Sequence, residues 1–315
     1  MTADARAQLE AILSAGVVNL DRRPLVAHSS HRLEELDVTL EDGTILPLVL
    51  KHLGRDGMLT EALATRPPFM ADSWREAVVY TELLSDECRG TARCCGVFNE
   101  PGDGQSLVLE RIVGPDLSVV ALPAWIEAAR WLGRFHAELR ARARTPPRRL
   151  LRYDPPAWKR WLGRATSFAS NGDRATLEWL APRHNAAVEC LSEVPVTVLH
   201  GDFHASNVLV VHGSEGLRIC PVDWERAGVG PGPIDLAALT AGGWTDEQRE
   251  ALTAAYLETC GDLYSSAASV DRALTASRLQ LAVQWLGWSR DWQPPSEHRQ
   301  DWLSEAVLCA KVLEN

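Results

Sequence analysis

The chain has 315 residues, of which 46% are hydrophobic and 23% charged, and it carries a formal net charge of −10. This composition is that of an ordinary globular protein, and it argues against a disordered, collagen-like or coiled-coil chain. An acidic chain lacks the basic surface that nucleic-acid binding requires, so no nucleic-acid partner is expected.

The N-terminal segment and the cysteines favour a cytoplasmic protein. The first 16 residues include Asp4 and Glu10 and have no apolar core of signal-peptide length. No run approaches the roughly 20 apolar residues that a transmembrane helix needs, so no membrane partner is expected. The seven cysteines show neither a CxxC pair nor zinc-ligand spacing, which is typical of reduced thiols in a cytosol.

The first 112 residues are predicted to be mostly strands with one internal helix. Alternating apolar residues around turn signals indicate strands, and Ser73 is placed to begin the helix. The expected elements are a helix over 4–15, two strands within 33–53 around the turn 41–43, a helix over 73–85, and strands over 94–98 and 106–112.

Beyond residue 112 the pattern becomes helical, interrupted by a β-rich island at 196–223. A β-rich part followed by a helical part is an α+β pattern and not an alternating βαβ sheet. We therefore expect two lobes, 1–112 and 113–315. The expected helices cover 121–143, most of 157–193, 245–260, 271–289 and 298–313.

The β-rich island carries the residues expected to do chemistry. Asn207 opens an apolar strand and Asp223 ends the strand that returns, so an antiparallel hairpin would place them side by side. Asp202 lies on the loop that enters this hairpin. Carboxylate and amide oxygens suit Mg²⁺ with a polyphosphate, and Asp202 would be free to accept a proton from a hydroxyl. The alternative interpretation gives these three residues ordinary roles in a loop, a turn and a strand end.

The motif HGDFHASN, followed by VDWE and GPGPIDLA, resembles the aminoglycoside phosphotransferase and choline kinase family, which shares the protein-kinase-like fold. Its H-x-D-x-x-x-x-N spacing also matches the catalytic loop of protein kinases. The resemblance covers most of the chain. It implies a small β-rich nucleotide-binding lobe, a larger mostly helical lobe for catalysis and acceptor binding, and ATP and Mg²⁺ as cofactors.

The resemblance also implies a role for each residue of the motif. Asp202 would be the catalytic aspartate, and Asn207 and Asp223 would bind Mg²⁺. His200 would brace the loop, while Asp235 of the IDLA segment would hold the loop through backbone hydrogen bonds.

The N-terminal part should then contain a lysine that binds phosphate. Lys51 ends an apolar strand and is one of only three lysines in the chain. Glu76, early in the helix 73–85, is the expected ion-pair partner, and such a pair can hold the α- and β-phosphates. The alternatives are an edge-strand lysine facing solvent and a solvated helix charge. The segment SLVLERIVG, residues 106–114, is the hinge that the resemblance implies, with main-chain groups from Glu110 to Ile112 facing adenine.

The loop expected to cover the nucleotide departs from the pattern, because residues 26–36 contain no glycine. Glycines let backbone N–H groups approach phosphates closely. Here Ser29 and Ser30 would supply hydroxyl and N–H donors instead.

The helical lobe offers two features with alternative interpretations. Trp285, Trp288 and Trp292 share a helix face, which indicates either core packing or the aromatic wall of an acceptor pocket. Acidic residues of the same region either face a cationic substrate or form a solvated surface. These acids are Asp291, Glu297, Asp301 and Glu305.

These observations favour a kinase that phosphorylates a hydroxyl of a small molecule, with an aminoglycoside or nucleoside antibiotic as the acceptor class and drug resistance as the result. A metabolic kinase for choline, homoserine or a sugar amine fits the same motifs, because motifs do not encode acceptor pockets. A kinase-like scaffold without phosphoryl transfer is the third interpretation. The missing glycines favour it, whereas the presence of Lys51, Asp202, Asn207 and Asp223 argues against it. The choice between ATP and GTP, and the oligomeric state, are open at this level.

Overall fold

The computed structural model describes residues 3–27, 29–84, 90–99, 104–213, 216–291 and 300–314. Two residues named above, Trp292 and Glu297, lie outside this range. The chain divides into two compact units. The first unit comprises Met1–Ala64, Ala71–Pro115 and Leu209–Glu225, and the second comprises Thr65–Met70, Asp116–Val208 and Arg226–Asn315.

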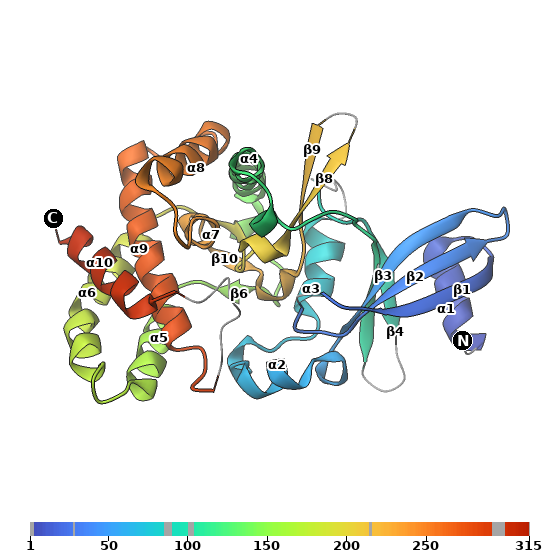
Figure 1. Ribbon diagram of the computed structural model, residues 1–315, viewed down its shortest axis with the longest axis horizontal. Helices are drawn as coiled ribbons and strands as arrows, with labels where there is room; N and C mark the ends of the chain where they lie inside the picture. The colour runs from blue at the N-terminus through green and yellow to red at the C-terminus, as the bar shows by residue number, and fades with distance from the viewer. Residues whose placement is uncertain are drawn as a thin grey trace. The chain divides into compact units, whose positions relative to one another are not determined.

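The first unit is built on a five-stranded sheet with the strand order β1-β2-β3-β5-β4 (Figure 1). Each pair of neighbouring strands is antiparallel. Gly43 adopts a φ of 85° in the turn between β2 and β3, where the sequence predicted it. The strands are β1 (Val17–Leu25), β2 (Leu33–Leu40), β3 (Ile45–Leu53), β4 (Cys94–Asn99) and β5 (Gln105–Glu110).

The sequence patterns predicted β2 to β5 but missed β1. Its sequence, VVNLDRRPL, lacks apolar alternation because β1 is an edge strand whose residues are mostly exposed. Helix α1 (Ala3–Leu13) was predicted, and it contributes Leu9 to the core of this unit. The other buried members of that core come from the sheet: Val17, Leu36, Val38, Leu48, Leu50, Phe98 and Val108.

The predicted helix at 73–85 is shorter than expected and changes form along its length. Helix α3 (Arg75–Val78) continues as a π-helical turn, Val79–Leu83. A further helix that the sequence did not indicate, α2 (Thr60–Thr65), precedes it.

Strands β8 (Val208–Gly213) and β9 (Gly216–Pro221) form the predicted two-stranded sheet. Although these strands come late in the chain, they belong to the first unit. The Val210 N–H donates to the Pro115 carbonyl at 2.9 Å, and the Arg218 guanidinium binds the Glu110 carboxylate at 2.9 Å. The first compact unit thus includes residues from beyond position 112. The division into a nucleotide-binding lobe, 1–112, and a catalytic lobe, 113–315, stays a prediction.

The second unit is mostly helical and holds a three-stranded sheet of order β6-β10-β7. Helix α9 packs against α5, α6, α7 and α10, and α4 packs against α8 (Figure 1). At Gly133 of α4 an added Cβ would lie 2.3 Å from Thr259 Oγ1, so a glycine is needed there. The strands are β6 (Leu151–Arg152), β7 (Val196–Leu199) and β10 (Gly228–Pro231). The helices are α4 (Leu122–Leu139), α5 (Pro155–Phe168), α6 (Arg174–Ser192), α7 (Pro233–Leu239), α8 (Asp246–Thr259), α9 (Ala267–Leu286) and α10 (Trp302–Leu313).

Local signals explain where several of these helices begin. Asp154 accepts a hydrogen bond from the Ala157 N–H at 3.1 Å, and prolines fill the first turn of α5. Thr245 and Gln248 form a capping box at the start of α8. The predicted α+β class, with a β-sheet part and a helical part, is confirmed. In the described part of the chain no helix has both the length and the hydropathy to span a bilayer.

Candidate active site

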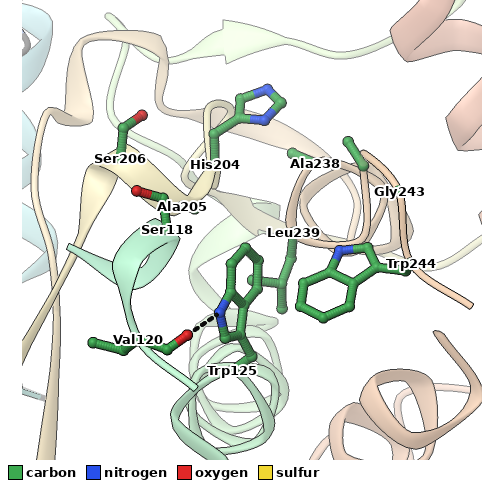
Figure 2. Close-up of a pocket in the computed structure, with 11 residues that line it drawn as sticks. Ser118, Val120, Trp125, His204, Ala205, Ser206, Ala238, Leu239, Gly243 and Trp244 are labelled. Carbon is green, nitrogen blue, oxygen red and sulfur yellow. Dashed lines mark hydrogen bonds between the residues drawn. The ribbon is translucent and has the colours of Figure 1, made fainter. Parts of the chain in front are cut away.

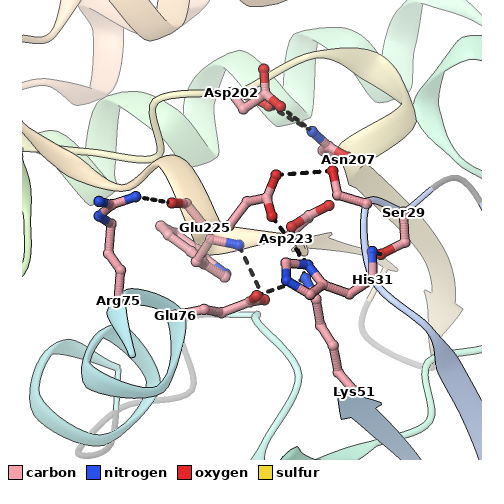
Figure 3. Close-up of polar contacts among 11 residues, drawn as sticks. Ser29, His31, Lys51, Arg75, Glu76, Asp202, Asn207, Asp223 and Glu225 are labelled. Atoms are coloured by element: carbon pink, nitrogen blue, oxygen red, sulfur yellow. Dashed lines mark hydrogen bonds and ion pairs between the residues drawn. The ribbon is translucent and has the colours of Figure 1, made fainter. Parts of the chain in front are cut away.

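The Lys51 ammonium is buried between two carboxylates of the first unit (Figure 3). Its Nζ lies 2.6 Å from Glu76 Oε2 and 2.7 Å from Asp223 Oδ1. Burial by itself lowers the pKa of Lys51, but the charges of Asp223 and Glu76 outweigh that effect and raise it. The lysine is therefore a fixed cation. It does not face solvent, and the expected ion pair with Glu76 is present.

The two carboxylates share one ammonium in a buried place. Burial raises the pKa of Glu76 and that of Asp223, because neither charge is fully compensated. Glu76 Oε1 also accepts the Trp224 N–H at 3.2 Å, which ties α3 to the segment after β9. Asp223 itself has a φ of 65°, a left-handed conformation that a non-glycine residue rarely adopts. This cluster has an excess of negative charge that a bound cation would compensate.

Glu225 organises the first unit around this cluster, a role that the sequence did not reveal. Its carbonyl accepts from Arg75 Nη1 at 2.5 Å, and its Oε1 accepts from Ser30 Oγ at 3.1 Å. His31 Nδ1 lies 3.2 Å from Glu225 Oε2, and the His31 N–H donates to Ser29 Oγ at 3.1 Å. The loop expected to cover the nucleotide is thus held to Glu225. The sequence signal for Glu225 was its place in the VDWE motif, which left its role open.

In the second unit, Asp235 fixes the start of the catalytic loop. Its Oδ2 accepts the His200 N–H at 2.7 Å, and its Oδ1 accepts the Gly201 N–H at 2.8 Å. The carboxylate is fully buried, and His136 Nε2 lies 3.2 Å from Oδ2. The backbone hydrogen bonds expected of Asp235 are therefore present. The buried His200 ring packs edge-on against Phe203, 5.6 Å between centroids.

Gly201 is required at the next position of this loop. It has a φ of 78°, and a Cβ there would lie 2.1 Å from the Arg226 carbonyl oxygen and 2.3 Å from the Tyr153 hydroxyl. The Tyr153 hydroxyl donates to that same carbonyl at 2.8 Å. The loop is thereby fixed against the segment that begins at Arg226.

Both oxygens of the Asp202 carboxylate are engaged. Arg226 Nη1 lies 2.6 Å from Oδ1, and Asn207 Nδ2 donates to Oδ2 at 3.2 Å (Figure 3). Asn207 Nδ2 also donates to the Asp202 carbonyl at 3.0 Å. Asp202 is thus held in one orientation by a cation and an amide, and its expected role of accepting a proton from a hydroxyl stays a prediction.

Arg226 is itself fixed by tryptophans of the second unit. Its guanidinium carbon lies 4.9 Å from the ring centroid of Trp288 and 5.3 Å from that of Trp285. Both indoles are at most 9% exposed, and Trp288 stacks on Trp161 at 5.8 Å. These tryptophans are core residues that support Arg226, which favours the core-packing interpretation. Their spacing was visible in the sequence, but their partner was not.

The predicted hinge residues lie at the end of β5. The Glu110 N–H donates to the Arg93 carbonyl at 2.8 Å, and the Arg111 N–H donates to the Pro47 carbonyl at 3.2 Å. The Glu110 amide is therefore already used, which leaves Ile112 as the better candidate for a main-chain contact with adenine. That contact stays a prediction.

The metal ligands also stay predictions. Among the described residues, no group of three or more His, Cys, Asp or Glu side chains is arranged to hold a metal ion. The donor chemistry nevertheless fits. Nδ2 of Asn207 donates to Asp202, so its Oδ1 remains a ligand atom, and Asp223 supplies a carboxylate whose side chain is 12% exposed.

A cavity of about 390 Å³ lies beside the catalytic loop within the second unit (Figure 2). His204 and Ser206, on either side of Ala205, form one side of it. Trp125 of α4 and Trp244, which follows α7, form another, with ring centroids 4.6 Å apart. This volume is within the usual range of small-molecule pockets.

Comparison with known proteins yields a family match. The model of the phosphotransferase enzyme family matches residues 96–269, which is more than half of the chain. A search among curated proteins found no significant match.

Solved structures resemble the fold over nearly the whole chain. A putative aminoglycoside phosphotransferase from Ralstonia eutropha has a TM-score of 0.61 and 13% identity, covering 99% of this chain and 96% of its own. A microcompartment-associated aminopropanol kinase has a TM-score of 0.59 and 17% identity, covering 98% and 95%. An amicoumacin kinase in complex with AMP-PNP and Ca²⁺ has a TM-score of 0.56 and 13% identity, covering 99% and 93%.

Proposed function

Because this chain belongs to the phosphotransferase enzyme family, we propose that it transfers the γ-phosphate of Mg·ATP to a hydroxyl of a small molecule. The observation that carries the proposal is the Lys51 ammonium, buried and held by Glu76 and Asp223. A buried lysine with two acidic partners costs desolvation energy, and a solvent-facing residue would avoid that cost. Such an arrangement is typical of a site that binds phosphate.

In this proposal Lys51 binds the α- and β-phosphates while Glu76 keeps its ammonium oriented. Ile112 supplies main-chain contact to the adenine. Asp223 and Asn207 are the proposed Mg²⁺ ligands. The argument for using both comes from the sequence, because Asn207 precedes the hairpin of β8 and β9 and Asp223 follows it. Bound Mg²⁺ would neutralise charge on the phosphates. The AMP-PNP and Ca²⁺ in the amicoumacin kinase structure support a nucleotide with a divalent cation as the cofactor pair.

Asp202 is the proposed base. The acceptor oxygen forms a bond to the γ-phosphorus, the bond between that phosphorus and the leaving oxygen of ADP breaks, and the hydroxyl proton passes to the Asp202 carboxylate. The contacts with Arg226 and Asn207 fix the carboxylate, so much of the catalysis would come from positioning.

The proposed acceptor is an antibiotic, which phosphorylation would inactivate. A susceptible bacterium expressing the protein should then tolerate more of the drug than one expressing Asp202→Ala. Equal tolerance across a drug panel would leave a metabolic acceptor as the alternative.

The first experiment is a calorimetric titration of ATP into the wild type and Asp223→Ala, with and without Mg²⁺. We expect binding that depends on the metal and weakens at least tenfold in the variant. The matched control is Asp246→Ala, because that carboxylate is 95% exposed at the start of α8. Absence of ATP and GTP binding under every metal condition would overturn the proposal in favour of a scaffold without phosphoryl transfer.

A further inference from the structure

Among the described residues that line the cavity beside the catalytic loop, none carries a carboxylate, an ammonium or a guanidinium group. It is enclosed by aliphatic residues, two indoles, two serines and His204, all within the second unit. Cation-binding sites in proteins usually present a carboxylate to their ligand, because burying an unpaired ammonium is costly. The lining of this cavity therefore suits a ligand without formal charge.

Two acidic groups close in the chain to this lining, Asp116 and Asp202, are engaged by other partners, whereas Asp246, two residues beyond Trp244, is 95% exposed and is not among the described residues of the lining. Asp116 accepts hydrogen bonds from both the main-chain N–H and the hydroxyl of Ser118. Asp202 is paired with Arg226 at 2.6 Å. A positively charged acceptor would therefore meet a neutralised carboxylate and a fixed guanidinium at the catalytic aspartate.

Two of the four C-terminal acids, Asp301 and Glu305, are engaged by other groups as well. Asp301 accepts the Ser304 N–H at 3.0 Å and caps α10, and Glu305 lies 2.7 Å from Arg278 Nη2. For these two acids the contacts weaken the interpretation that they face a cationic substrate, while the interpretation of Asp291 and Glu297 stays open.

The two indoles provide a hydrophobic surface for a ring. Trp125 is fixed, because it is 9% exposed and its Nε1 donates to the Val120 carbonyl at 3.3 Å. Trp244 meets it edge to face, with an angle of 76° between the rings (Figure 2). One indole edge therefore covers part of the other ring, which leaves open faces and not a closed aromatic cage.

Polar groups are few and are placed away from the indoles. Ser118 and Ser206 lie across the cavity from Trp244 in Figure 2. Within the described residues, no donor or acceptor binds the Ser206 hydroxyl, so that group is available to a ligand hydroxyl. Hydroxyl groups at one side and aromatic faces at the other match a molecule with a flat ring and an alcohol-bearing part.

From these observations we propose that this cavity binds the acceptor and that the acceptor is an uncharged, ring-bearing alcohol of the nucleoside or aromatic glycoside type. The ring would pack on Trp244 and Trp125, and its hydroxyl-bearing part would lie toward the loop residues 204–206. This inference rests on the proposed function, because the bound molecule is an acceptor only if the protein transfers phosphate to it. It predicts that aminoglycosides and choline are not acceptors.

The test measures binding without nucleotide, so that it does not depend on phosphoryl transfer. Four probes are titrated calorimetrically into the full chain: uridine and salicin as uncharged ring alcohols, and kanamycin and choline as cations. The variants are Trp244→Ala and Trp244→Phe, with Trp179→Ala as the control, because Trp179 lies on α6 outside the cavity. Trp244 is only partly buried, so its removal leaves the core intact.

We expect at least one uncharged probe to bind, about tenfold more weakly in Trp244→Ala, with recovery in Trp244→Phe and no change in Trp179→Ala. Neither cation should show binding that depends on Trp244. The proposal is overturned if no uncharged probe binds, if binding is the same in Trp244→Ala, or if a cation binds in a manner that depends on Trp244. Failure of these titrations while ATP still binds overturns only the acceptor assignment, whereas loss of ATP binding overturns the kinase function.

Discussion

Arg226 Nη1 lies 2.6 Å from Oδ1 of Asp202, and the two residues are separated by a whole β-hairpin in the chain. The guanidinium is only 6% exposed and packs over Trp285 and Trp288. A buried arginine of this kind has little rotational freedom, so it limits the orientations of the carboxylate that it binds. In a reaction that depends on aligning an acceptor hydroxyl, this restraint should affect the rate more than substrate binding.

Replacing Arg226 should therefore slow catalysis. We expect Arg226→Ala to lower kcat about 100-fold, while the Kd for ATP changes less than twofold. The kcat of Arg226→Lys should lie between that of Arg226→Ala and that of the wild type, because lysine keeps the charge but lacks the planar group that faces the indoles. Steady-state kinetics and ATP titration give the two quantities.

The matched control for that variant is Arg130→Ala. Arg130 pairs with Glu127 and Glu258 on the surface of the second unit, and its side chain is 33% exposed. Its removal should leave kcat unchanged. A normal kcat in Arg226→Ala would show that Asp202 needs no such restraint.

Removing Lys51 should destabilise the protein as well as abolish ATP binding. Lys51→Met leaves Glu76 and Asp223 buried without their cation, and we expect a loss of about 3–5 kcal/mol in the free energy of unfolding. Adding Glu76→Gln removes one of the uncompensated charges. The double variant should recover about 1–2 kcal/mol of stability without recovering ATP affinity.

Urea unfolding and calorimetry separate these two effects. Should the double variant be no more stable than Lys51→Met, electrostatic repulsion between the remaining carboxylates is not the source of the loss. ATP binding that survives in either variant would contradict the assignment of Lys51 to the phosphates.

Asp235→Asn tests the anchor of the catalytic loop. An amide presents one acceptor oxygen where the carboxylate presents two, so one of the N–H groups of His200 and Gly201 loses its partner. Since these groups are buried, we expect a loss of about 2–3 kcal/mol in unfolding free energy and a lower kcat. Asp246→Asn, on an exposed side chain, should change stability by less than about 0.5 kcal/mol. Equal stability of the two variants would argue against the anchor.

The contact between β5 and β9 should make stability depend on pH. The Arg218 guanidinium, bound to Glu110 at 2.9 and 3.0 Å, holds the pKa of Glu110 below its ordinary value of 4.5. A lowered pKa in the folded state means that this carboxylate adds stability above pH 4.5 and loses it as the pH falls through the lowered value.

Glu110→Gln should accordingly be about 1 kcal/mol less stable than the wild type at pH 7, and the difference should shrink below pH 4. Urea unfolding at a series of pH values measures this. A difference that stays constant down to pH 3 would show that the contribution of Glu110 is not electrostatic.

Local patterns in the sequence predicted most of the elements and the motif. The strands from β2 to β5, the hairpin of β8 and β9 and most helices were predicted, because alternation, helical periodicity, turns and caps are local properties of the chain. The motif of Asp202, Asn207, Asp223 and Asp235 was visible because its members have a fixed spacing. The edge strand β1 and the helices α2 and α7 were among the elements missed, since none of the three has a clear periodic pattern of its own.

Which distant residues meet depends on the packing of the whole fold. The contact of Arg75 with the Glu225 carbonyl and the packing of Arg226 between Asp202 and the C-terminal tryptophans left no local pattern in the sequence. The cavity likewise left no local pattern in the sequence, because its lining comes from three separate segments: α4, the catalytic loop and the segment after α7. Such contacts depend on how whole elements pack, and a side chain's own neighbours in the sequence do not determine what it touches across the core.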